Sequence, residues 1–301
     1  MVEVLIPGTL AEALGMLADR EGAVPLAGGT DVLLDMRTGR SDPTVLVDMS
    51  RLDGLRGVGI DGDLVTIGAM TSIRTIERDA ELAARSTAVP EAAHVLGSVQ
   101  IRVMATLGGN LCHATPSAEM PPPLLVHGAE VDIAGPDGGR TVPLADLFAG
   151  PGATTLDPGE LVAAVRYPAP SNLGSCYLRQ TVRWSMDLAG VGVAASVAVD
   201  GDRITTATVA LGAVAPTPFV VGGVADLMAD DPWDPERAGE AGRMAAAASS
   251  PISDARGSAD YRCSVVAALV PRALGIAYRR AIGGWPVGRF SPTNGLVEEP
   301  A

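Results

Sequence analysis

Two short segments that each contain a Gly-Gly pair constrain this 301-residue chain most strongly. The first reads Leu26-Ala-Gly-Gly-Thr-Asp-Val-Leu33, and the second reads Ala105-Thr-Leu-Gly-Gly-Asn-Leu111. Glycine has no Cβ, so the backbone can come close to a ligand and turn its N–H groups inward. A row of such N–H groups forms a nest that binds anions. The two segments therefore predict two loops that hold a phosphate-bearing ligand in one domain.

Either segment alone could be an ordinary turn, because the chain holds 36 glycines. Two with matching surroundings favour binding, although such loops could hold any nucleotide. Thr30, Thr106 and Asn110 could add side-chain donors. About five or six hydrogen bonds to a charged group, at roughly 1.5–3 kcal/mol each, would account for micromolar to nanomolar binding.

A third glycine motif, Gly190-Val-Gly-Val-Ala-Ala195, matches the letters of a dinucleotide-binding fingerprint. That fingerprint requires a strand before it and a helix after it. The residues that follow, Ser196–Asp200, alternate and lead into a turn, so they predict a strand. We therefore expect no Rossmann site there.

Composition excludes several classes of function. A net charge of −13, with only 3 Trp, 4 Tyr and 3 Phe, argues against nucleic acid binding, which needs basic surface and stacking side chains. Cys112, Cys176 and Cys263 form no CxxC pair and cannot hold an iron–sulfur cluster alone. No signal peptide and no bilayer-spanning apolar run are evident. We expect a reduced, cytoplasmic protein without membrane insertion.

The hydrophobic pattern before residue 170 predicts short strands mixed with helices. Strands are expected at Val4–Ile6, Ala23–Ala27, Val45–Asp48 and Leu64–Gly68, with a hairpin over 129–144. Helices are expected after the capping-box spacing of Thr9 and Glu12, and at about Ile73–Ala84 and Pro90–Leu96.

A Pro- and Asn-rich joint around Pro168–Asn172 marks the expected domain boundary. Beyond it the pattern predicts a hairpin from Val191 to Leu211 and helices at Pro235–Ala248 and Ala259–Ile282. The expected fold class is α+β. We expect a first domain over 1–170 with subdomains at about 1–55 and 56–170, a smaller domain of antiparallel sheet plus helices over 171–284, and an extended or disordered tail over 285–301.

Taken together, these motifs resemble the FAD-binding medium subunit of molybdenum hydroxylases, the carbon monoxide dehydrogenase and xanthine dehydrogenase family. The resemblance extends to about Gly284 and implies a PCMH-type FAD-binding domain followed by a flavoprotein C-terminal domain. Its most specific part is Gln100-Ile-Arg102 with Ala105–Glu119. The other similar stretches are Pro25–Leu34, Val47–Leu52, Leu64–Thr71, Tyr177–Gln180, Met186–Ala189 and Val214–Pro218.

The resemblance also implies cofactor-binding roles. Glu119, usually Asp in the family, would accept hydrogen bonds from the adenosine ribose or nearby backbone, and His113 stands where several relatives have threonine. Arg179 would lie on the flavin side, and Leu188 would approach the isoalloxazine ring. The residues expected to line the diphosphate are Gly28, Gly29, Thr30, Asp31, Thr106, Gly108, Gly109 and Asn110, and Leu26, Ala27, Val32 and Thr115 complete the set.

Several of these residues also have a structural interpretation. Glu119 could favour the start of a short helix over Ala118–Val126, and Arg179 could be a solvent-facing strand residue. His113, like His94 and His127, could be structural. Because the first segment contains no His or Cys, FAD is expected to bind non-covalently.

We assign no catalytic or metal-binding residue to this chain, so a bound cofactor would carry the chemistry. The resemblance implies that electrons pass from [2Fe–2S] clusters of a small partner subunit through FAD to NAD, a quinone or oxygen. A large partner subunit would hold the molybdenum cofactor, in a dimer of heterotrimers. Two other functions stay open: a stand-alone FAD oxidoreductase of the same superfamily, and a FAD-free assembly or binding module.

Overall fold

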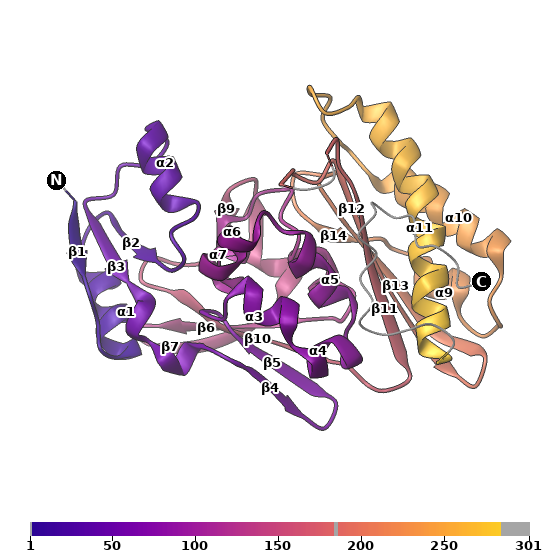
Figure 1. The fold of residues 1–301 in the computed structure, drawn as a ribbon, viewed down its shortest axis with the longest axis horizontal. Helices are drawn as coiled ribbons and strands as arrows, with labels where there is room; N and C mark the ends of the chain where they lie inside the picture. The colour runs from indigo at the N-terminus through magenta and orange to yellow at the C-terminus, as the bar shows by residue number, and fades with distance from the viewer. Residues whose placement is uncertain (1, 184–185, 284–301) are drawn as a thin grey trace.

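The computed structural model describes residues 2–183 and 186–283, so the expected tail over 285–301 lies outside the described residues. Three main sheets follow one another along the long axis of the molecule, with helices packed beside them (Figure 1). Strands and helices are mixed along the chain, which confirms the expected α+β class.

The first sheet is parallel and has the order β1-β3-β2. Its helix α1 begins after Thr9, whose Oγ1 accepts the N–H of Glu12 at 3.2 Å, as the capping-box spacing predicts. The helix α2, which follows the first glycine segment, was not expected from the pattern. The elements of this part are β1 (Glu3–Leu5), α1 (Leu10–Asp19), β2 (Ala23–Leu26), α2 (Val32–Thr38) and β3 (Val45–Asp48).

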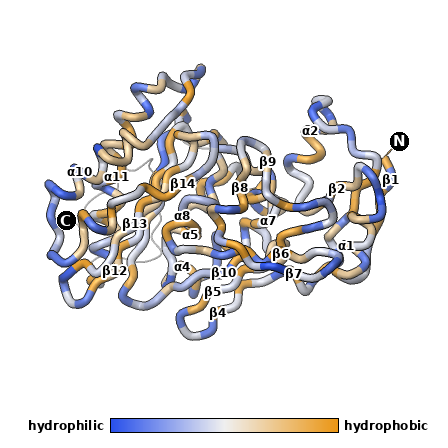
Figure 2. Tube along the Cα trace, turned by 180° about the vertical axis from the view of Figure 1, so that it is seen from behind, coloured by the Kyte–Doolittle hydropathy of each residue, from blue (hydrophilic) through white to orange (hydrophobic). Residues whose placement is uncertain are grey.

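The second sheet is antiparallel and has the order β4-β5-β10-β6-β7. Its strands are β4 (Val58–Asp61), β5 (Leu64–Gly68), β10 (Leu161–Pro168), β6 (Glu130–Gly135) and β7 (Gly138–Pro143); β8 (Phe148–Gly150) and β9 (Ala153–Thr154) form a separate small hairpin. The turn between β4 and β5 is hydrophilic (Figure 2).

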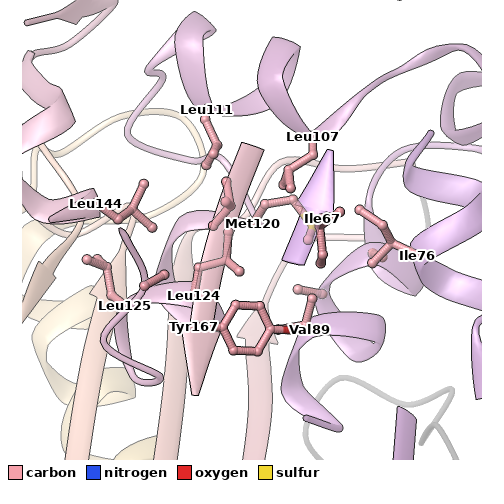
Figure 3. Packing of buried hydrophobic residues seen from close by; sticks show 14 of the residues in the cluster. Ile67, Ile76, Val89, Leu107, Leu111, Met120, Leu124, Leu125, Leu144 and Tyr167 are labelled. Atoms are coloured by element: carbon pink, nitrogen blue, oxygen red, sulfur yellow. The ribbon is translucent and has the colours of Figure 1, made fainter. Parts of the chain in front are cut away.

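Six short helices lie between β5 and β6 in the chain. The expected single helix over Ile73–Ala84 is wrong, because Asp79 ends one helix and its carboxylate caps the next by accepting the N–H of Leu82 at 2.8 Å. Ile67, Leu107, Leu124 and Tyr167 are all buried in one core (Figure 3). The helices are α3 (Ile73–Arg78), α4 (Ala80–Arg85), α5 (Ala88–Val95), α6 (Val99–Met104), α7 (Leu107–His113) and α8 (Pro121–Leu125).

The third sheet is antiparallel, with the order β11-β12-β13-β14, and the long helices α10 and α11 pack beside it (Figure 1). The residues after Gly190 form β12, which confirms that the dinucleotide-like motif there is a strand. The elements are β11 (Leu173–Gln180), β12 (Val191–Asp200), β13 (Arg203–Gly212), β14 (Phe219–Val220), α9 (Val224–Met228), α10 (Pro235–Ala248) and α11 (Ala259–Ala281).

Residues on both sides of the Pro168–Asn172 joint share buried surface. Tyr177, Ala194 and Ala210 from the third sheet belong to the same core as Ile67 and the helices of the second sheet. An ion pair closes this interface, because Arg280 Nη2 of α11 donates to Glu91 Oε1 of α5 at 2.6 Å. The two parts of the chain therefore pack as one body.

Candidate functional site

The two glycine segments touch through their backbones. A Cβ added to Gly28 would lie 2.0 Å from the carbonyl oxygen of Met104 and 2.9 Å from Cα of Ala105. These distances leave room for glycine alone. Ala105 in turn accepts the N–H of Ile73 at 2.9 Å, which fixes the second segment to α3. The structure therefore brings together the two segments that the sequence singled out.

The first segment is a loop between β2 and α2. Gly29 has φ of 71°, in the left-handed region that favours glycine. Among the described residues, no hydrogen bond engages the N–H groups of Gly28, Gly29, Thr30 or Asp31. Four consecutive free N–H groups fit an anionic ligand.

The second segment is not a loop, so that expectation is wrong. Thr106 caps α7 by accepting the N–H of Gly109 at 3.1 Å, and the N–H of Asn110 binds the carbonyl of Thr106. The N–H of Gly108 binds the carbonyl of Ala69 at 2.8 Å. These N–H groups already have protein acceptors, so this segment offers a ligand its side chains and glycine surface rather than a backbone nest.

Asn110, in the first turn of α7, has a buried acceptor that makes no hydrogen bond to the described residues. Its Oδ1 is buried and has no hydrogen-bond partner among the described residues. Leaving a buried acceptor unpaired costs about 1–3 kcal/mol, so such an atom calls for an explanation. A ligand with hydroxyl or N–H donors would satisfy it. This acceptor and the free N–H groups of the adjoining first segment together fit a nucleotide cofactor.

Glu119 and Arg179 form a buried ion pair between the two parts of the chain, with side chains only 6% and 4% exposed. Burial raises the pKa of Glu119 to about 7, although the Arg179 guanidinium opposes the rise. The interpretation of Arg179 as a solvent-facing residue is therefore wrong. Glu119 also precedes its helix, because α8 begins at Pro121 and not at Ala118.

A turn after β11, termed the Asp187 turn, consists of the described residues Val182, Arg183, Met186, Asp187 and Leu188. The Asp187 carboxylate accepts three backbone N–H groups, from Val182 at 3.0 Å, Arg183 at 2.9 Å and Leu188 at 3.0 Å. Burial acts to raise the pKa of Asp187, but these donors outweigh it and hold the pKa below its ordinary value. Leu188 is 49% exposed, so its side chain is free to meet a ligand.

The three histidines differ in their surroundings. His113 ends α7, and its Nε2 lies 3.7 Å from Oδ2 of Asp35 in α2. His94 Nδ1 lies 2.9 Å from Oε1 of the buried Glu77. His127 is buried 5.0 Å from the ring of Tyr167, and burial lowers its pKa to about 4. The structural interpretation thus fits His94 and His127, while His113 lies between α7, which contains the second glycine segment, and α2, which follows the first.

Sequence reasoning missed a buried charged cluster in which Arg102 of α6, Arg74 and His94 surround Glu77. Arg102 Nε donates to Glu77 at 2.8 Å, and its Nη1 donates to the carbonyls of Leu96 and Gly97. Burial acts to raise the pKa of Glu77, but hydrogen bonds from Arg74, His94 and Arg102 outweigh it and lower the pKa. The available signal was one arginine within the apolar stretch Val99–Met104.

The described residues hold neither a metal-binding cluster nor a membrane-spanning helix. They contain no cluster of three or more His, Cys, Asp or Glu side chains placed to hold a metal ion. None of the helices in this part of the chain has both the length and the apolar character needed to cross a membrane.

Two family models match the chain. The FAD binding domain in molybdopterin dehydrogenase matches residues 1–170, and the CO dehydrogenase flavoprotein C-terminal domain matches residues 176–277. The carbon monoxide dehydrogenase medium chain of Afipia carboxidovorans is 32% identical over 277 residues, which cover 91% of this chain and 96% of that one. The xanthine dehydrogenase FAD-binding subunit of Escherichia coli is 34% identical over 215 residues, or 70% and 73% of the two chains.

A solved structure agrees with these sequence matches. A chain of the carbon monoxide dehydrogenase from Hydrogenophaga pseudoflava, in a form that lacks the Mo-pyranopterin moiety, superposes with a TM-score of 0.89 at 30% identity. The match covers 93% of this chain and 98% of that one. Both family models, the near-complete coverage of a medium chain and the paired glycine segments lead to one conclusion. This chain belongs to the family of FAD-binding medium subunits of molybdenum hydroxylases, which are oxidoreductase subunits.

Proposed function

We propose that this chain binds one FAD non-covalently and serves as the electron-transfer subunit of a molybdenum hydroxylase. The observation that carries the proposal is the row of N–H groups from Gly28 to Asp31, which, like the buried Oδ1 of Asn110, have no hydrogen-bond partner among the described residues. The N–H groups would hold the diphosphate, and Asn110 would accept a hydrogen bond from the cofactor. When bound, FAD would pass electrons from [2Fe–2S] clusters of a partner subunit to NAD, a quinone or oxygen.

Other residues would shape the site around the cofactor. Thr30 adds a hydroxyl to the first segment, whereas the hydroxyl of Thr106 already caps α7. Leu188 offers an exposed apolar side chain to the flavin ring. The buried carboxylate of Glu119 is paired with Arg179, so we assign it a structural role in the site and not the role of a hydrogen-bond acceptor for the ribose.

The partner subunits are part of the proposal. The relatives are named as medium or FAD-binding subunits, which supports a large molybdenum-cofactor subunit and a small [2Fe–2S] subunit as partners. Their arrangement as a dimer of heterotrimers is part of the same proposal. Large apolar side chains at the protein surface mark contact sites when they gather together. On α2 and α6 such side chains are at least 41% exposed: Leu33, Leu34, Val99, Ile101, Val103 and Met104.

We also infer a domain boundary near residue 170 and a cytoplasmic location. The ranges of the two family models support the boundary, since one ends at residue 170 and the other begins at residue 176. Three free cysteines fit a reducing compartment.

The first experiment is the visible absorption spectrum of the purified chain, with chromatography of the cofactor released on denaturation. Released FAD supports the proposal, and flavin that stays on the denatured chain contradicts non-covalent binding. A colourless chain that also fails to bind added FAD favours the assembly module. Turnover of a small substrate by the isolated chain favours the stand-alone oxidoreductase.

Co-expression tests the partner subunits. The three genes of the complex are expressed together, and the chain is purified through a tag on itself alone. Iron and molybdenum in the purified complex support the electron-transfer role. A chain that always purifies alone, although it holds FAD, contradicts that role and leaves FAD binding intact.

A further inference from the structure

One described residue of the Asp187 turn has an unfavourable backbone conformation. Met186 has φ of 52°, in the left-handed region that residues other than glycine rarely adopt. The carboxylate of Asp187 holds this shape by accepting the N–H groups of Val182, Arg183 and Leu188. An unfavourable conformation persists where surrounding contacts impose it, and such positions gather at functional sites.

Arg179 ties this turn to the amino-terminal part of the chain. Its Nη1 donates to the main-chain oxygen of Asp187 at 3.1 Å and also to the carboxylate of Glu119. One nitrogen makes both bonds, so the place of the Asp187 carbonyl is set relative to Glu119. Because both charged side chains are buried, water competes little for these bonds.

The two ends of this connection belong to different parts of the candidate site. Glu119 ends the stretch that begins at the cap residue Thr106 and contains Asn110, whose Oδ1 has no hydrogen-bond partner in the part of the chain that the structure describes. At the other end, the Asp187 turn presents apolar side chains to the surface, with Met186 61% and Leu188 49% exposed. Arg179 contacts both ends, Glu119 through its carboxylate and Asp187 through its main-chain oxygen.

We propose that Arg179 is a positioning residue that sets the Asp187 turn, and with it Leu188, relative to the Thr106–Glu119 segment before the cofactor binds. The role rests on the proposed function, because Leu188 would meet the ring of FAD. Arg179 needs no contact with the cofactor in this role. Its effect passes through Asp187, whose carbonyl it holds.

Hydrogen exchange measured by NMR on the cofactor-free chain tests the positioning directly. In Arg179→Met, the amides of Val182, Arg183 and Leu188 are expected to exchange about tenfold faster, because the turn loses a hydrogen bond from a charged donor. Arg179→Lys is expected to restore most of the protection, since a single nitrogen makes both bonds. Arg203→Met is the matched control, because Arg203 lies in an exposed ion pair with Asp230.

The spectrum of bound flavin supplies a readout that a merely structural role would not move. Arg179→Met is expected to bind FAD at the glycine segments yet show higher flavin fluorescence, because Leu188 no longer covers the ring. Arg179→Lys is expected to give the spectrum of the unmodified chain.

The outcomes separate the positioning role from the alternatives. Unchanged exchange in the Asp187 turn, or faster exchange by the same factor throughout the protein, overturns the role of Arg179. If Arg179→Met does not fold, the double variant Arg179→Met with Glu119→Gln removes both charges and leaves none buried and unpaired. If the unmodified chain binds no FAD, the proposed function fails, whereas the exchange of the turn amides still decides the role of Arg179.

Discussion

Replacing Asn110 by leucine separates the needs of folding from the needs of cofactor binding. The Oδ1 of Asn110 is buried without a partner among the described residues, so the cofactor-free chain carries an unsatisfied acceptor. Asn110→Leu removes that acceptor with a side chain of similar size. The variant is therefore expected to be more stable than the unmodified chain without FAD, and to bind FAD more weakly.

Both effects have a magnitude. An unpaired buried acceptor costs about 1–3 kcal/mol, which is the expected gain in the free energy of unfolding of Asn110→Leu without FAD. A gain of 1 kcal/mol raises Tm by roughly 2–4 °C in a chain of this size. Loss of the same bond to the cofactor is expected to raise the Kd for FAD about 5- to 150-fold.

Thermal unfolding of the cofactor-free chain and calorimetric titration with FAD measure the two quantities. Asn172→Leu is the matched control, because Asn172 Nδ2 already donates to the carbonyl of Val199 at 2.9 Å. That control is expected to lose stability and keep its Kd for FAD. An Asn110→Leu chain that is less stable without FAD, or that binds FAD with an unchanged Kd, would refute the reasoning.

Three further changes test other contacts. Gly28→Ala is expected to lower the free energy of unfolding, measured by chemical denaturation, by about 3 kcal/mol or more, because its Cβ would meet the backbone of Met104. Gly15→Ala, in open space on α1, should cause no loss. Equal effects of the two changes would contradict the backbone contact. Arg280→Met leaves Glu91 buried without its partner, so denaturation should show a loss of about 3–5 kcal/mol, and a loss below 1 kcal/mol would refute a structural role for the pair. The folded pKa of Glu119 is raised to about 7, so the stability of the cofactor-free chain should depend on pH. As the pH rises from about 4.5 to 7, the chain should lose about 1–3 kcal/mol of unfolding free energy relative to Glu119→Gln. A difference between the two that is flat across this range would contradict the raised pKa.

The sign of the pH effect follows from the direction of the shift. Between its unfolded pKa and its raised folded pKa, Glu119 holds a proton in the folded chain and has lost it in the unfolded chain. Raising the pH through this window therefore favours unfolding.

Much of the fold follows from local sequence signals. The strand Val45–Asp48 is a short apolar run, and the helix Pro235–Ala248 starts with a proline after the cap residue Asp234, so both match their expected limits. The helix α6 was missed because Val99, Ile101 and Val103 are β-branched residues with low helix propensity. Its cap at Ser98 and the buried Arg102 hold it as a helix instead.

The candidate site was predictable in one part and not in another. The Gly-Gly pairs pointed to a loop at Gly28–Asp31, because glycine marks close backbone approach. In the second segment the same Gly-Gly pair lies in the first turn of α7, which begins at Leu107. There the Thr106 hydroxyl accepts the N–H of Gly109, and the carbonyl of Ala69 accepts the N–H of Gly108. The pairing of Glu119 with Arg179 joins residues 60 positions apart, and no local pattern specifies such a partner.

The shared core gives the joint at Pro168–Asn172 a meaning beyond its sequence. Tyr177, Ala194 and Ala210 fill the core of the preceding part, and Ser196 Oγ donates to the carbonyl of Val126 at 2.7 Å. A fragment that stops at the joint would leave that apolar surface open to water, and we expect it to aggregate when made alone. The same interface should let two separately made fragments find each other, so the chain is a natural candidate for reconstitution from halves.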